Sequence, residues 1–154
     1  MKQIIDHYEV NQNTMALLSI AHMEYSTLVF EENQQFYVRK TPIQIIKEAC
    51  LDGGSTYDGR RRAVSYRTGS QQKVPIPINP KDKIFAFPTH SPKSFLCNWI
   101  FYHHVKYIST YKSPDHLNVQ SVITFKNGQR ISLQESQYIL EKQMQRTAIC
   151  ITGF

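Results

Sequence analysis

The amino-acid sequence predicts an α+β fold, built as a curved antiparallel β-sheet with about three helices. Short runs rich in β-branched and aromatic residues, separated by turn residues, indicate the strands. Three other segments begin with a helix-start signal, and the first and last of them also carry apolar residues at helical spacing. The chain has 154 residues, of which 41% are hydrophobic, so we expect one domain, residues 1–154, with a core that needs no metal or disulfide.

The first part of the chain is predicted to form strands that lead into a helix. The expected strands are residues 8–10, 14–20, 26–32 and 35–40, with a hairpin turn at Asn33-Gln34. The helix begins after Thr41 as N-cap, with Pro42 in its first position and Gln44 placed to complete a capping box. Gly53-Gly54 ends it. Its expected buried face consists of Ile45, Ile46, Ala49 and Cys50.

A second helix is predicted directly after these glycines. Ser55 to Asp58 resembles a capping box, with aspartate in place of the usual glutamate, so a short helix is expected from Thr56 to about Tyr66. Gly59 weakens this helix by up to ~1 kcal/mol, which leaves a loop as the alternative.

The remaining segments are predicted to be strands followed by a last helix. Prolines limit residues 74–78 and 84–87 to short or edge strands. One long strand is expected over 98–111. A hairpin around Asn127-Gly128 joins 119–125 to 130–133, in a register that pairs Val122 and Thr124 with Leu133 and Ile131. The last helix is expected to start at Ser136 and to run through Leu140, Met144 and Ala148.

Positive charge is concentrated in one part of the sequence. The chain carries +6, but residues 59–112 alone carry +9 and the flanking residues carry −3. A segregated positive field suggests an anionic partner, with nucleic acid as the first candidate and a solvated surface as the alternative.

The basic segment supplies the candidate DNA-contacting residues. Three consecutive arginines on a helix cannot all face a core, and arginine suits a phosphate or a narrow A-tract minor groove. The Gly53-Gly54-Ser55 helix start offers a phosphate contact. Trp99, Phe85 and Phe87 are expected in the core rather than stacked on bases. The candidates are Ser55, Tyr57, Arg60, Arg61, Arg62, Arg67, Lys73, Lys81, Lys83 and Lys93.

No catalytic or metal-binding motif is present, so we expect no catalytic residue, no metal and no cofactor. His103 and His104 on a strand would point to opposite faces, one packed and one exposed. The three cysteines and the absence of a signal-peptide pattern or an apolar run of membrane-spanning length predict a protein of the reducing cytoplasm. A metal-dependent nuclease and a protein-interaction module with a basic face stay as alternatives.

Several segments stand in an order that resembles one known family. They are Phe36 to Val38 with Thr41 to Ile46, Cys50 with Gly54 to Arg60, Lys73 to Ile76 with Pro80, Ile84 to Thr89 and Ser91-Pro92, Cys97 to Ile100 with His104-Val105, and Phe125 to Gly128 with Arg146 to Ala148. In this the sequence resembles the ComK competence transcription factors of low-GC Gram-positive bacteria.

The resemblance implies a non-enzymatic transcriptional activator of DNA-uptake genes, associated with the nucleoid. It implies binding of paired A·T-rich boxes through the minor groove, by dimers that assemble into higher oligomers. It also implies turnover through a Clp-protease adaptor. Residues 149–154 depart from the family, whose members continue into a further tail, so we expect a chain that binds DNA without activating transcription.

Overall fold

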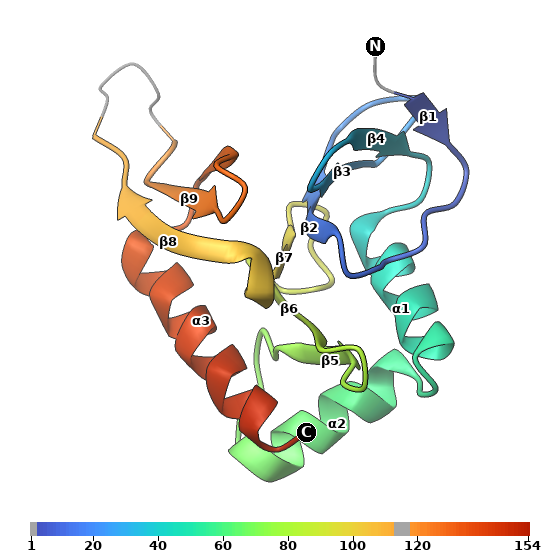
Figure 1. Cartoon of the computed structure of the whole chain (residues 1–154), viewed down its shortest axis with the longest axis vertical. Coiled ribbons are helices and arrows are strands. Elements are labelled where there is room, and N and C mark those ends of the chain that lie inside the picture. The colour runs from blue at the N-terminus through green and yellow to red at the C-terminus, as the bar shows by residue number, and fades with distance from the viewer. Residues whose placement is uncertain (1–2, 113–117) are drawn as a thin grey trace.

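The computed structural model describes residues 3–112 and 118–154 of the chain (Figure 1). The helices are α1 (Pro42–Asp52), α2 (Tyr57–Thr68) and α3 (Gln137–Thr152), with a 3-10 helix η1 (Tyr102–His104). The strands are β1 (Gln3–Ile5), β2 (Thr14–Ser19), β3 (Thr27–Glu31), β4 (Gln35–Val38), β5 (Ile76–Asn79), β6 (Ile84–Pro88), β7 (Trp99–Phe101), β8 (Val105–Thr110), β9 (Ser121–Phe125) and β10 (Arg130–Leu133).

The strands form two sheets, which confirms the α+β fold but divides the expected sheet in two. The larger sheet has the order β1-β4-β3-β2-β7-β6-β5, and the smaller has the order β10-β9-β8. All pairs are antiparallel except β1 with β4. Figure 1 shows α1 leading down into α2, and α3 running beside β8 so that its C-terminal end lies near α2.

The prediction of one long strand over 98–111 was wrong. The chain leaves the larger sheet at Phe101, turns through η1, and enters the smaller sheet at Val105. β7 contributes to two cores, because Trp99 packs in a cluster with residues of α1 and α2, whereas Ile100 packs with Ile108 of β8 in a cluster that includes Leu140 of α3. The bulky residues over 98–111 therefore come from a fully buried strand, β7, and a half-buried strand, β8, rather than from one strand.

The hairpin around Asn127-Gly128 forms, but one residue out of the predicted register. Val122 is paired with Ser132 and Ile123 with Ile131. The loop has three residues rather than two, because the Phe125 amide donates to the Gln129 carbonyl at 2.8 Å. Gly128 takes a φ of 90° there, which glycine adopts without strain and which a three-residue hairpin loop requires.

The N-terminal strand was predicted in the wrong place. Residues 8–10 are not a strand, and β1 lies earlier, parallel to β4 at the sheet edge. Tyr8 is nevertheless buried, where its hydroxyl shares a hydrogen bond with the Thr14 hydroxyl at 2.7 Å and donates to the Glu31 carboxylate. The buried aromatic ring of Tyr8 explains why residues 8–10 resemble a strand in the sequence.

Both early helices form where the sequence predicts them. Thr41 and Gln44 make the expected reciprocal capping box of α1. The N-cap of α2 is Thr56 rather than Ser55, and its hydroxyl accepts from the Gly59 amide at 2.9 Å. A Cβ on Gly59 would stand 3.0 Å from that same hydroxyl oxygen, so glycine gives the cap its room.

The three cysteines are buried and free, and burial raises the pKa of each thiol from 9.0 to about 11. At pH 8 this leaves about 100-fold less thiolate than in the unfolded chain, and the thiolate is the reactive form. We therefore expect the native thiols to react with Ellman's reagent at least ~100-fold more slowly than in urea. Because folding raises the pKa of the thiols, the neutral buried thiols make their full contribution to the free energy of unfolding below pH 9. That contribution is lost as the pH rises through 11. Rapid reaction of one native thiol would contradict this burial.

Candidate nucleic-acid interface

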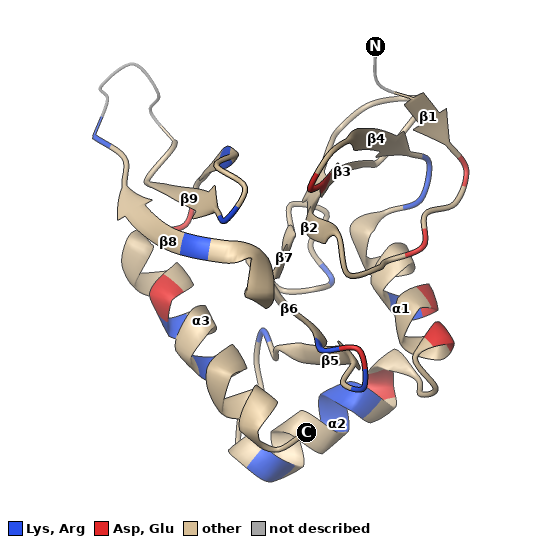
Figure 2. Ribbon diagram, viewed as in Figure 1, with Lys and Arg blue, Asp and Glu red and all other residues tan. Residues whose placement is uncertain are grey.

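Helix α2 has one buried residue, Val64, and exposes Asp58, Arg62, Tyr66 and Arg67 to solvent. Its first turn holds Asp58 and its second holds the three arginines predicted as DNA contacts. Figure 2 shows Lys and Arg along α2, at the turn between β5 and β6, and on α3, β8 and the hairpin that follows β9. The positive charge of the chain is thus spread over several faces.

The three consecutive arginines have different environments. Arg60 is half-buried and donates to the Gly53 carbonyl at 2.8 Å, which ties α2 to the end of α1. Arg61 donates to the Asp58 carboxylate at 2.8 Å and keeps 38% of its side chain exposed. Arg62 lies 3.4 Å from the same carboxylate with 77% of its side chain exposed. Arg61 and Arg62 are therefore exposed enough to reach a ligand, although both are paired with Asp58, whereas Arg60 is bonded to the backbone at the end of α1.

A groove of about 850 Å³ lies beside the start of α2 and draws on three separate parts of the chain. It brings together three of the predicted site residues, Tyr57, Arg61 and Lys93, which are up to 36 positions apart in sequence. The lining residues are Ile43, Lys47, Leu51, Thr56, Tyr57, Asp58, Arg61, Gln71, Ser91, Pro92 and Lys93. We call this surface the α1–α2 groove.

Lys47 of the α1–α2 groove was not among the predicted residues. It lies outside the basic segment, on an otherwise mildly acidic helix, so the charge pattern did not select it. Its position four residues after Ile43 on a helix whose start is well marked places both on one face. The four-residue spacing from Ile43 to Lys47 was the signal in the sequence that could have identified Lys47.

The other predicted residues lie away from the groove. Arg67 donates to the Gly153 carbonyl and stacks its guanidinium 4.4 Å from the centre of the Phe154 ring. Lys73 has a φ of 48°, and its carbonyl accepts from Gln143 at 2.9 Å. Lys81 and Lys83 are exposed at the turn between β5 and β6. The basic segment therefore does not form one continuous surface.

The Gly53-Gly54-Ser55 segment uses its backbone donors to close α1. The amides of Gly53, Gly54 and Ser55 donate to the carbonyls of Ala49, Leu51 and Cys50 at 3.0 to 3.1 Å. The Ser55 hydroxyl, rather than an unpaired amide, is thus the group that this segment offers to a phosphate.

Tyr57 lines the groove and packs against the core. Its ring meets the buried Trp99 ring edge to face, with the centroids 6.3 Å apart. Burial raises the pKa of the Tyr57 phenol to about 12, so it stays a neutral donor at physiological pH. The Arg61 hydrogen bond lowers the pKa of the neighbouring Asp58 carboxyl, which is therefore ionised and faces the two arginines.

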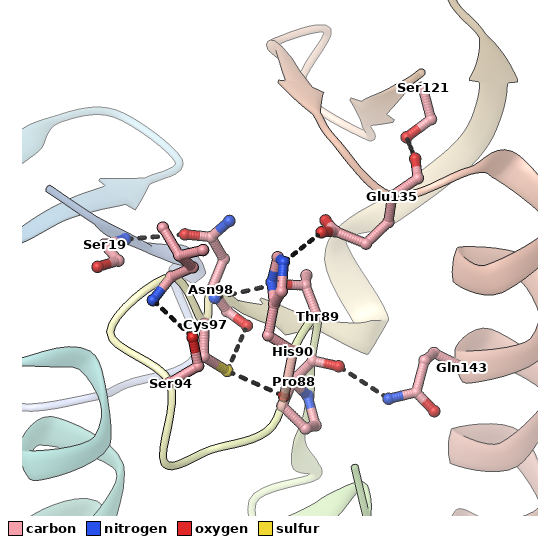
Figure 3. A network of polar contacts seen from close by, with 11 residues as sticks. Ser19, Pro88, Thr89, His90, Ser94, Cys97, Asn98, Ser121, Glu135 and Gln143 are labelled. Carbon is pink, nitrogen blue, oxygen red and sulfur yellow. Dashed lines mark hydrogen bonds and ion pairs between the residues drawn. The ribbon is translucent and has the colours of Figure 1, made fainter. Parts of the chain in front are cut away.

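The loop that carries Lys93, residues 89–98, is held at its base by a network of polar contacts (Figure 3). The Thr89 hydroxyl accepts from the Asn98 amide at 3.0 Å, and the Asn98 side chain accepts from the Ser19 amide at 2.8 Å. The Cys97 thiol donates to the His90 carbonyl at 3.4 Å. These bonds fix both ends of the loop against the end of β2.

A second set of contacts joins this loop to α3 and the smaller sheet. His90 lies 2.9 Å from the buried Glu135 carboxylate, and Gln143 donates to the Pro88 carbonyl at 2.8 Å (Figure 3). Burial raises the pKa of Glu135, which the facing His90 partly offsets. Lys93 is therefore presented from a fixed loop.

In the described ranges, residues 3–112 and 118–154, no three His, Cys, Asp or Glu side chains are grouped as a metal would require. His103 and His104 lie on η1 rather than on a strand; His103 is exposed, and His104 is half-buried against the Gln12 carbonyl at 2.7 Å. Within the same ranges no helix has the length and apolar character needed to cross a membrane.

Known proteins resemble this chain over nearly its whole length. The family model described as "ComK protein" matches residues 5–154. The "Competence transcription factor" of Bacillus subtilis (strain 168) is 34% identical over 151 residues, which are 97% of this chain and 76% of that protein. No solved structure matches the chain.

Proposed function

This chain belongs to the ComK protein family, and from that premise we propose that it regulates competence genes by binding A·T-rich double-stranded DNA. In this proposal the whole domain, residues 1–154, is the DNA-binding unit. It acts without catalysis, through the minor groove and the phosphate backbone. It would work at the nucleoid, where a DNA-binding transcription factor meets its sites.

The α1–α2 groove is the observation that carries the proposal. Lys47, Arg61 and Lys93 approach it from α1, α2 and the 89–98 loop, and three cations around one concave surface suit a phosphate backbone. Its one acidic residue, Asp58, is already paired with arginine. Arg62 projects beside the groove and is the best placed residue to enter a narrow minor groove.

The exposed face of α2 favours minor-groove over major-groove readout. A recognition helix presents several side chains that read base edges at regular spacing. Here Arg60 is tied to Gly53, and Arg67 is tied to the end of α3. The remaining predicted contacts, Ser55, Lys73, Lys81 and Lys83, are proposed as peripheral phosphate contacts on a longer or bent duplex.

A gel-shift assay tests the proposal directly. We expect tighter binding to an A·T-rich than to a G·C-rich probe, and an affinity that falls steeply with salt because each neutralised phosphate releases counterions. Absence of binding at low salt would refute the proposal. Cleavage of the probe that depends on added Mg²⁺ would instead support a nuclease.

Binding paired boxes requires more than one copy, so we propose a homo-oligomer on DNA and, as in the family, a Clp-protease adaptor as a protein partner. Binding without activation stays a prediction for residues 1–154. A promoter reporter compared with the Bacillus subtilis relative measures it, and activation at the relative's level would contradict it.

Replacing Asp58 by asparagine is expected to strengthen DNA binding about two- to fivefold, because the exposed, weak ion pairs of Asp58 with Arg61 and Arg62 compete with phosphate for the two arginines. The change frees Arg61 and Arg62 and removes a negative charge from the groove. Gel shifts at fixed salt measure the effect. Asp6→Asn is the matched control, since it frees Arg39 from a 2.7 Å ion pair at the end of β4. An equal gain in both variants would mean that only net charge matters.

A further inference from the structure

The 89–98 loop exposes two large apolar side chains at its tip. Phe95 is 83% exposed and Leu96 is 50% exposed. They follow Lys93 closely in the sequence, so cationic and apolar groups share one projection. Two adjacent exposed apolar side chains beside a cation suit a ligand that offers both apolar and negatively charged surface, as nucleic acid does.

Hydrogen bonds hold the backbone at this tip, with the two side chains on the outside. The Ser94 amide donates to the Ser91 carbonyl at 2.9 Å, and the Cys97 amide donates to the Ser94 carbonyl at 3.1 Å. The Ser19 hydroxyl donates to the Phe95 carbonyl. With the contacts at its base (Figure 3), the loop is a rigid support rather than a free segment.

Phe95 also adjoins the α1–α2 groove. Pro92 and Lys93 line that groove, and the same two residues line a neighbouring hollow of about 370 Å³ together with Phe95 and Leu96. A duplex that follows Arg61 and Lys93 along the groove would therefore pass over Phe95.

We propose that Phe95 is an apolar wedge that inserts between base pairs of bound DNA from the minor-groove side, with Leu96 packed behind it. The inference rests on the proposed function and specifies how the DNA is deformed. Minor-groove proteins unstack a base step with a Phe, Leu, Ile, Met or Pro side chain, which kinks the duplex and brings more of it into contact. A·T-rich DNA supplies flexible TA steps, where such a kink is easiest.

The charge around the loop favours DNA over a protein partner at this tip. Three cations, Lys47, Arg61 and Lys93, line this surface, and the one acidic residue that lines it, Asp58, is paired with Arg61. Tyr138, another exposed aromatic, differs because it lies on α3 with the Lys142 ammonium 5.3 Å from its ring centre. It lines neither the α1–α2 groove nor the neighbouring hollow.

The test compares full-length variants on an A·T-rich duplex with 2-aminopurine at the expected step and a dye pair at its ends. The wild-type chain is expected to raise the 2-aminopurine fluorescence and to bring the dyes closer. Phe95→Ala should lose both signals and bind about tenfold more weakly, with an unchanged salt slope because Phe95 contacts no phosphate. Phe95→Trp should retain both signals, and Tyr138→Ala should behave as wild type.

The outcomes separate the wedge from the proposed function. If wild type binds with a steep salt slope but Phe95→Ala unstacks and bends the DNA equally well, the wedge is wrong and DNA binding stands. If Phe95→Ala keeps the DNA signals but weakens self-association in sedimentation, the tip is a protein contact and the wedge is also wrong. If wild type binds no duplex at all, both proposals fall.

Discussion

Replacing Arg61 and Lys93 together by alanine is expected to weaken binding to A·T-rich DNA about 30- to 100-fold near 0.1 M salt. Each neutralised phosphate contributes about 0.9 to the slope of log affinity against log salt, which is about tenfold in affinity between ~0.1 M and ~1 M. Removing both cations from the α1–α2 groove should therefore lower the magnitude of that slope by nearly two. Removing Arg61 also leaves the Asp58 carboxylate facing the phosphates.

Filter binding or gel shifts across a salt series measure both quantities. Lys126→Ala with Arg130→Ala is the matched control, because it removes the same charge from exposed positions at the hairpin between β9 and β10. The control is expected to lose only a few-fold in affinity through the long-range field. Equal losses in the two double variants would mean that the groove has no special role, and no loss in either would place the interface elsewhere.

Replacing Trp99 by alanine is expected to lower the free energy of unfolding by about 3–5 kcal/mol. Trp99 is fully buried between the larger sheet and the first two helices, and Tyr57 of the groove packs edge to face against it. Its indole N–H has no partner among the described residues, so Trp99→Phe loses volume but no hydrogen bond and should cost less.

Urea unfolding followed by circular dichroism tests this expectation, with the midpoint shifted and the slope preserved. Tyr138→Ala is the control on an exposed aromatic and should change the free energy by less than about 0.5 kcal/mol. A Trp99→Ala chain as stable as the Tyr138→Ala chain would show that the first core does not depend on this residue.

Local signals in the sequence were sufficient for the helices. The capping box of α1 involves residues three apart and needs no information from the rest of the chain. The break between β7 and β8 could not be predicted in this way. It lies where the chain passes through η1 from the larger sheet to the smaller sheet, and this passage depends on tertiary packing rather than on a local signal. The hairpin register failed for a related reason: Asn127-Gly128 fits two loop lengths, and packing selects between them.

The candidate site was predictable as a set of residue types but not as a surface. Charge segregation selected Arg61 and Lys93, yet only the packing of the 89–98 loop beside α2 places both on one groove. Arg60 and Arg67 look alike in sequence to Arg61, and their carbonyl partners at Gly53 and Gly153 distinguish them only in three dimensions. Lys47 was missed because it lies in a segment whose net charge is not positive.

The bond from Gln143 to the Pro88 carbonyl has a mechanical consequence. Pro88 is the last residue of β6, and the loop that carries Lys93 starts next to it. A force applied to that loop by a bound duplex would act on the end of β6. The hydrogen bond from Gln143 to the Pro88 carbonyl would then transmit part of this force to the middle of α3. If Phe95 kinks DNA as proposed, the elastic recoil of the duplex would therefore act on a helix that packs against the smaller sheet as well as on the loop.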